Sequence, residues 1–116
     1  MSTETRASER IIEEVGSWPG VAVGHGDRGE LAFTVGRREL GHLHGDRAAH
    51  FGFPKEVWAE LNAEGRIAHH PVFPGRAGPA ARRIDGDSDV RDVIALMRLN
   101  YDRIVERYGV PAEASP

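Results

Sequence analysis

The sequence predicts a single α+β domain over residues 6–109, in which helices pack on one face of a mainly antiparallel sheet of about five to six strands. A length of 116 residues suits one domain with a buried core. Short runs of alternating apolar residues, separated by glycine turns, indicate strands joined as hairpins. Near the C-terminus, apolar residues recur every three or four positions, which indicates a long helix. The expected order is α-β-β-β-β-α-β-β-α, with flexible tails at 1–5 and 110–116.

The first helix is expected over residues 8–15. Its apolar residues form one stripe: Ile11, Ile12 and Val15. Gly16 and Pro19 end this helix, because glycine and proline both disfavour its continuation. Residues 21–25 then form a short strand, which ends at the glycine-containing turn 26–29.

Residues 30–35 show the cleanest strand alternation in the chain. The side chains on its core face are Leu31, Phe33 and Val35. A turn at Gly36 leads into a strand over 39–44, so these two strands form a hairpin. After a second turn at Gly45, residues 48–53 form a fourth strand. Its core-facing side chains are Ala49, Phe51 and Phe53.

The second helix is expected to begin at Pro54, because proline at the first helical position loses no hydrogen bond. Its inward-facing residues are Val57, Trp58 and Leu61. Gly65 supplies the left-handed residue that ends it. Residues 67–73 are partly extended and interrupted by Pro71, and residues 80–84 form the last strand.

The closing helix carries eight apolar residues on one face: Val90, Val93, Ile94, Met97, Tyr101, Ile104, Val105 and Tyr108. Asp87 or Ser88 is expected to cap its N-terminus. Since full burial of a large aliphatic side chain contributes about 1.5–3 kcal/mol, this helix should cross the sheet and form much of the core. We expect Ile94 and Met97 near its centre, and a buried Tyr101 whose hydroxyl has a polar partner.

Composition excludes several classes of function. The chain has no cysteine, which excludes disulfides, thiolate metal sites and thiol catalysis. A formal net charge of −3 argues against nucleic-acid binding. The polar N-terminus does not resemble a signal peptide, and no apolar run reaches the ~20 residues that span a bilayer, so we expect a cytoplasmic protein without membrane contact. The glycines at 24–29 lack the ending of a phosphate loop, and the chain has no flavin or nicotinamide signature.

Three histidines are expected to share one face of the sheet. Side chains two positions apart on a strand point the same way, so His42 and His44 lie together. If Leu43 points into the core, both histidines point away from it. The apolar neighbours of His50 claim the core face of the next strand, which sends His50 to the same outer face. The alternative register buries Leu40 and takes the first two histidines inward with it.

Clustered imidazoles are typical of a site for a metal ion or a small ligand. Histidine is the commonest metal ligand, and a His-x-His pair on a strand brings two ring nitrogens to one ion. A divalent metal would be held by His42, His44 and a third ligand, which we expect to be His50. Asp46 or one of His69 and His70 would also serve as that ligand. Without a metal, the same rings would bind a small polar or anionic ligand or only face solvent. The candidate ligand-binding residues are His42, His44, His50, His69, His70 and Arg38.

Two members of this set depend on local geometry. His69 and His70 are adjacent in an extended segment, so at most one of them can join the cluster. Arg38 belongs to one of two arginine pairs, and guanidinium groups bind anionic oxygens in a bidentate manner. A surface role without any ligand is the alternative for each of these residues.

Several motifs resemble those of one known family: Arg38-Glu39-Leu40-Gly41-His42-Leu43-His44, Phe53-Pro54-Lys55-Glu56-Val57-Trp58, Ala63-Glu64-Gly65-Arg66, His69-His70-Pro71-Val72-Phe73-Pro74 and Arg98-Leu99-Asn100-Tyr101. Over about residues 36–108 the chain resembles short bacterial proteins of the luciferase-domain family. That resemblance implies no particular activity and no catalytic residues. The flavin-dependent luciferases are (β/α)₈ barrels of roughly 250 residues, so this chain is too short to be one. In architecture it is similar to the YjbR-like proteins.

Three functions remain open at this point. The first is a small ligand-binding domain that uses the histidine-lined open face of the sheet. The second is a small enzyme that uses the same histidines as acid–base groups or metal ligands. The third is a protein or nucleic-acid interaction module, which an exposed sheet face supports only if aromatic side chains lie on it.

Overall fold

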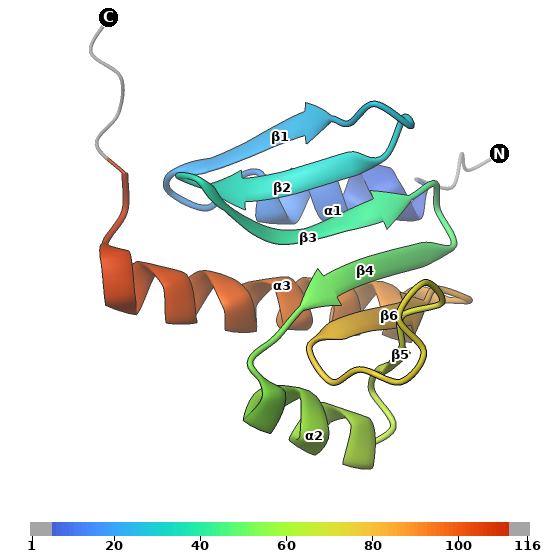
Figure 1. Ribbon diagram of the computed structural model, residues 1–116. Helices are drawn as coiled ribbons and strands as arrows, with labels where there is room; N and C mark the ends of the chain where they lie inside the picture. Colours follow the sequence, from blue (N-terminus) through green and yellow to red (C-terminus); the bar gives the residue numbers. More distant parts are fainter. Residues whose placement is uncertain (1–5, 112–116) are drawn as a thin grey trace, which may run out of the picture.

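Within residues 6–111, which the computed structural model describes, six antiparallel strands form one open sheet in the order β1-β2-β3-β4-β6-β5 (Figure 1). The strands are β1 Val21–His25, β2 Leu31–Val35, β3 Arg38–His44, β4 Ala48–Gly52, β5 Ala68–His69 and β6 Pro79–Arg83. The helices of this part of the chain are α1 Ala7–Val15, α2 Lys55–Ala63 and α3 Asp87–Tyr108. The tail expected at 1–5 lies outside the described residues, as does 112–116 of the second tail.

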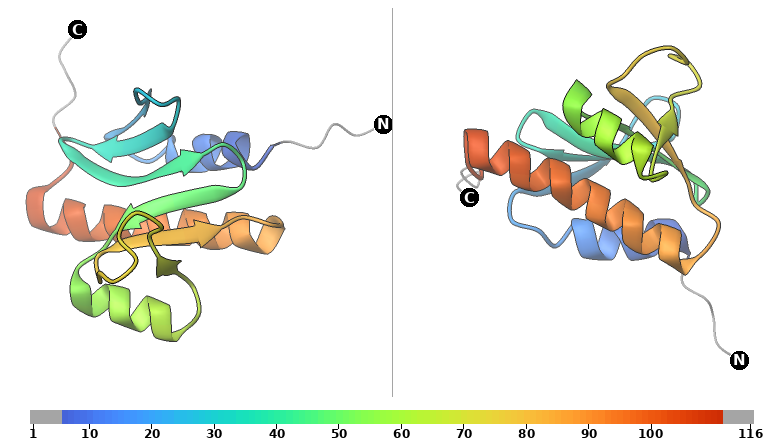
Figure 2. Two further views of the ribbon diagram at one scale, coloured as in Figure 1. Left: turned by 45° about the vertical axis from the view of Figure 1, so that its right-hand side comes forward. Right: turned by 90° about the horizontal axis from the view of Figure 1, so that it is seen from below.

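The helices are unevenly distributed around the sheet. Helices α1 and α3 lie side by side behind it, and α2 lies beyond β5 and β6 (Figures 1 and 2). The expected α+β class and element order are confirmed. No helix among residues 6–111 is long and apolar enough to cross a membrane. Because α1 and α3 cover one face of the sheet, its other broad face is left for a site.

Helix α3 forms the centre of the core, as its apolar stripe predicts. Met97 is fully buried, and the hydroxyl of the buried Tyr101 donates a hydrogen bond to the carbonyl of Pro19 at 2.7 Å. The buried face of α3 is rotated about the helix axis relative to the predicted face. Leu96 is fully buried, whereas Ile94 is only partly buried. The reason is that α3 packs against both the sheet and α1, so the two contacts together decide which face is buried.

A β-bulge in β3 changes the face on which its residues lie. Phe33 pairs with Gly41 and Thr34 pairs with Glu39, so Leu40 has no partner in β2. As a result Leu40 and Leu43 are both fully buried, although they are three positions apart. Strand alternation predicts that only one of these two leucines is buried. This is wrong, because the extra residue lets both point inward while the histidines stay outside.

Strands β3 and β4 diverge toward the end of β4 (Figure 1). Their pairing ends at His42 and His50, and the side-chain amide of Asn100 bridges the gap. Its nitrogen donates to the carbonyl of Leu40 at 3.0 Å and to that of Gly52 at 3.1 Å. Asn100 is fully buried, so it replaces ladder hydrogen bonds that the diverging strands do not make.

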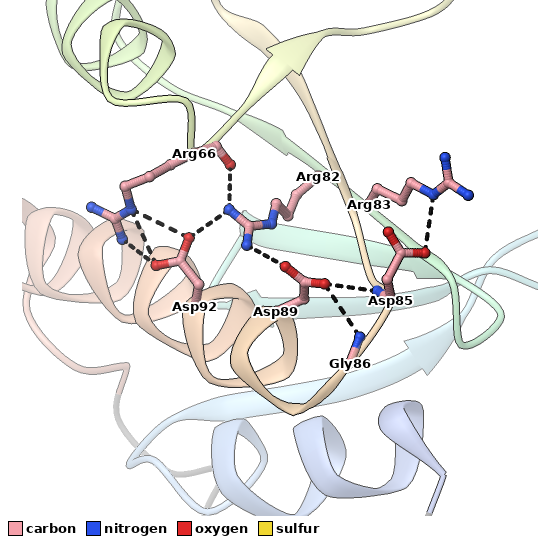
Figure 3. Close-up of polar contacts among 7 residues, drawn as sticks. All are labelled: Arg66, Arg82, Arg83, Asp85, Gly86, Asp89 and Asp92. Carbon is pink, nitrogen blue, oxygen red and sulfur yellow. Dashed lines mark hydrogen bonds and ion pairs between the residues drawn. The ribbon is translucent and has the colours of Figure 1, made fainter.

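A network of arginines and aspartates joins β6 to the start of α3 (Figure 3). Arg82 pairs with both Asp89 and Asp92, and Arg66 makes a bidentate pair with Asp92. Asp89 also accepts hydrogen bonds from the backbone N–H groups of Asp85 and Gly86. Arg82 is thus committed to structure. The N-cap is Gly86 rather than Asp87 or Ser88, because the Asp89 carboxylate satisfies the exposed backbone donors from inside the first turn.

The second helix also begins one residue later than expected. Pro54 is its N-cap, with an extended backbone, and the first helical residue is Lys55. The extended segment after this helix is short, since β5 contains only Ala68 and His69. Pro71 lies two residues beyond the end of this strand and cannot donate to a ladder, which limits its length.

Candidate functional site

Three histidine rings gather on the sheet face opposite α1 and α3, as strand alternation predicts. The ring centroids are 4.9 Å apart for His42 and His44, 5.3 Å for His42 and His50, and 4.4 Å for His44 and His50. One ring nitrogen from each lies within 4.8 Å of the others. The three side chains thus form a single cluster, which we call the histidine triad.

Small residues flank the triad along the sheet. His42 lies opposite His50 on β4 and opposite Ala32 on β2. On its other side, His50 lies opposite Ala81 on β6, which in turn lies opposite Ala68 on β5. Since alanine reaches only a short way out of the sheet, these neighbours leave the triad partly accessible: His44 is exposed, and His42 and His50 are half-buried.

Glu39 is part of this site, although the sequence analysis does not identify it. Its Oε2 lies 2.9 Å from Nδ1 of His42, and this hydrogen bond raises the pKa of His42 above the ordinary value, against the lowering effect of burial. A proton on Nδ1 donated to the carboxylate leaves Nε2 of His42 with its lone pair free. The one feature of the sequence that could have indicated the role of Glu39 is Gly41. A glycine inside a strand often marks a bulge, and the bulge brings Glu39 to the same face as His42.

His50 is partly buried within the triad. Burial, followed by the neighbouring His70, His44 and His42, lowers the pKa of His50 to about 4. It is therefore neutral at neutral pH, the form in which imidazole binds metals. Among the described residues its Nδ1 is buried and has no hydrogen-bond partner. Such an orphaned nitrogen is unfavourable unless a ligand satisfies it.

Of the adjacent histidines, only His70 joins the triad. Its ring centroid lies 4.2 Å from that of His50, and burial is the main cause that lowers the pKa of His70. Nδ1 of His70 accepts a hydrogen bond from the N–H of Val72 at 3.1 Å, so the neutral ring carries its proton on Nε2 and can donate it. His69 instead packs on the ring of Trp58, with centroids 4.8 Å apart.

Arg38 lies outside this cluster. Its guanidinium carbon is 3.5 Å from the ring centroid of Tyr108, at the end of α3. This is a cation–π contact, and it accounts for the half-exposed position of Tyr108 beyond the packed part of the helix. The structure therefore brings four of the six predicted site residues together and places Arg38 and His69 elsewhere.

Two cavities border the triad on different sides and share His42, His50 and His70. The larger has a volume of about 550 Å³ and lies where β3 and β4 separate. Its further lining residues are Glu39, Phe51, Gly52, Phe53, Pro54, Phe73, Gly78, Pro79 and Arg103. The smaller, of about 340 Å³, also contacts Asp27, Arg28, Glu30, His44 and Val72. The loop between β5 and β6, which carries His70, projects from the side opposite α1 and α3 (Figure 2).

The triad could hold one metal ion. Two nitrogens on one zinc ion lie at most about 4.2 Å apart, because each Zn–N bond measures roughly 2.0–2.1 Å. The separations within the triad extend to 4.8 Å, so small side-chain rotations suffice to close it around an ion. Three histidines leave at least one coordination position for water or a ligand, as in catalytic rather than structural zinc sites.

A scan against protein families matches residues 37–100, more than half of the chain, to the family described as Luciferase domain. Searches of curated proteins and of solved structures return no significant match, so the similarity to YjbR-like proteins stays a prediction. The antiparallel sheet of residues 6–111 differs from the eight parallel strands of a flavin-dependent luciferase barrel. The matched segment contains the whole triad and Glu39. The chain therefore belongs to the luciferase-domain family.

Proposed function

We propose that this protein is a small metal-dependent ligand-binding domain, in which His42, His44 and His50 hold one divalent transition-metal ion. The observation that carries the proposal is the convergence of three ring nitrogens within 4.8 Å on an open sheet face. Two further facts support it. Glu39 orients His42 in the manner of a carboxylate–histidine–metal arrangement, and Nδ1 of His50 lacks any other partner among the described residues.

The donor set favours particular ions. Three neutral imidazoles suit zinc, copper, iron or nickel, whereas magnesium and calcium prefer oxygen ligands. A bound ion would add positive charge between the two cavities. Its open coordination position would then attract a polar or anionic small molecule, and the imidazoles would no longer need to supply that charge themselves.

Zinc titration of the untagged protein tests this function. We expect one ion per chain by isothermal titration calorimetry. Zinc at a hundredfold excess over Kd should raise the free energy of unfolding by about 2.7 kcal/mol. His44→Ala should abolish both effects without harming the fold, because His44 is exposed. The exposed His25 on β1 lies outside the cluster, so His25→Ala is the matched control and should behave like the wild type.

The same titration can also contradict the proposed metal site. If zinc, copper and nickel all bind no better to the wild type than to His44→Ala, the triad is not a metal site. The remaining interpretation would be direct hydrogen bonding between the imidazoles and a ligand.

A metal-dependent enzyme is the second candidate, and His70 is the observation that favours it. Its Nε2–H is a donor beside the triad, while its Nδ1 is held by the backbone of Val72. A donor placed next to a metal-bound water or ligand can assist proton transfer. Zinc-loaded protein should then hydrolyse an activated ester such as p-nitrophenyl acetate faster than the zinc-free protein. His70→Gln should lower that rate and leave zinc affinity unchanged.

A further inference from the structure

The lining of the larger cavity includes a cation. Arg103 of α3 lines it, and one guanidinium nitrogen donates to Oδ1 of Asn100 at 3.0 Å. Asn100 is itself fixed by two backbone carbonyls, so it anchors the guanidinium on a buried, rigid group. Among the described residues Arg103 forms no ion pair, whereas six other arginines do. Those with a carboxylate partner are Arg6, Arg10, Arg66, Arg82, Arg83 and Arg98.

Apolar side chains also line this cavity. Phe51 and Phe53 are stacked, with ring centroids 5.4 Å apart, and Pro54 and Pro79 lie beside them. Phe51 and Phe53 are almost fully buried, whereas Phe73, on the loop between β5 and β6, also lines the cavity and remains 40% exposed. Aromatic side chains in a concavity of this size are typical of a pocket for a small organic molecule.

The cavity lining combines groups of different charge. It contains His42, His50 and His70 with the carboxylate of Glu39, and it also contains the guanidinium of Arg103. The carboxylate of Glu39, which lies beside His42, disfavours an acid group there as long as no metal is bound, because like charges repel. At the guanidinium of Arg103, an acid group would receive charge-assisted hydrogen bonds.

We propose that the cavity binds an amphipathic acid, with its carboxylate or other acid group on Arg103, its apolar body between Phe51 and Phe73, and its polar end at the triad. This deepens the proposed function, since the polar end would be the group that meets the metal ion. The contact with Arg103 does not require the metal, so it can be measured on its own.

Binding of 2-naphthylacetate and of its neutral analogue 2-naphthylethanol tests the proposal. Both have the same apolar body, and only the first carries an acid group. Calorimetry on the wild type should show the acid binding at least tenfold more tightly than the alcohol. Arg103→Gln should remove that difference, while Arg103→Lys, which keeps the charge, should retain most of it. Arg91 is exposed on the same helix and distant from the cavity lining, so Arg91→Gln should match the wild type.

Amide chemical shifts measured by NMR should locate the naphthyl ring beside Phe51 and Phe73. Equal affinity for the acid and the alcohol would overturn the proposal, as would acid binding that survives Arg103→Gln or the absence of naphthyl binding altogether. Zinc titration of the same variants separates the two proposals. Loss of acid binding in Arg103→Gln with zinc affinity intact supports the pocket, whereas absent zinc binding in a wild type that binds the acid defeats only the metal site.

Discussion

The carboxylate of Glu39 and Nδ1 of His42 lie 2.9 Å apart on one face of the sheet, although three positions separate them on the same strand. In a regular strand, residues three apart point to opposite faces. The bulge at Leu40 adds one residue and brings them to the same side. This relationship gives His42 a defined tautomer, and it places a negative charge beside the triad.

Glu39→Gln should weaken zinc binding by about 10–100-fold, because the amide no longer accepts the Nδ1 proton as a carboxylate does. The fold should persist, since Glu39 is exposed. Competition titration with a zinc-chelating dye measures the affinity. Glu56→Gln, an exposed glutamate in the first turn of α2, is the control. Unchanged zinc affinity in Glu39→Gln would mean that the carboxylate does not orient a metal ligand.

Gly41→Ala should destabilise the protein by about 1–3 kcal/mol, the range for overpacking a core. A β-carbon at Gly41 would lie 2.8 Å from the ring of Phe51 and 3.1 Å from the carbonyl oxygen of His50. Urea denaturation gives the free energy of unfolding. Gly52→Ala is the matched control, because a β-carbon there meets no atom within 4 Å. Equal stability of the two variants would show that β4 shifts freely, contrary to the packing of Phe51 on Gly41.

Asn100→Ala should cost about 2–5 kcal/mol of stability, since it leaves the carbonyls of Leu40 and Gly52 without their shared donor. The same change removes the anchor of Arg103, so affinity for 2-naphthylacetate should also fall. Chemical denaturation and calorimetry measure the two effects. Asn62→Ala on the exposed face of α2 should alter neither. A stable Asn100→Ala variant with wild-type acid binding would contradict the bridging role.

Acid should destabilise the wild type partly through Asp89. Hydrogen bonds from the backbone of Asp85, together with the side chain of Arg82, lower the pKa of Asp89 below its ordinary value near 3.8. A lowered pKa in the folded state contributes stability that is complete above the unfolded value and is lost as pH falls through the folded one. The loss should therefore begin near pH 4 and continue below it.

Comparison with Asp89→Asn isolates this contribution. The variant should be less stable than the wild type at pH 7, and the difference between them should shrink as pH falls below about 4. Asp102→Asn, an exposed position further along α3, should keep the acid transition of the wild type. Urea denaturation at pH 3, 4, 5 and 7 gives the curves. A constant difference between wild type and Asp89→Asn across this range would rule out Asp89 as a source of the acid sensitivity.

The sequence alone determines the element order and the outer face of the triad. Strand alternation is a local property of the backbone, so Leu43 and Phe51 turning inward is enough to send His42, His44 and His50 outward. The adjacency of His69 and His70 likewise limits the cluster to one of them. In the same way, the stripe of α3 predicts a central helix and a buried Tyr101 with a bonded hydroxyl.

Only the tertiary structure decides the rest of the site. The bulge depends on how β2 pairs with β3. The burial of Leu96 rather than Ile94 depends on α1 as well as on the sheet. Arg103 reaches the cavity because β3 and β4 separate above α3. Each of these is a contact between segments distant in the chain. Periodicity reports which side of its own element a residue takes, but the partner on that side is set by packing and by the need to satisfy buried polar groups, as at Asn100.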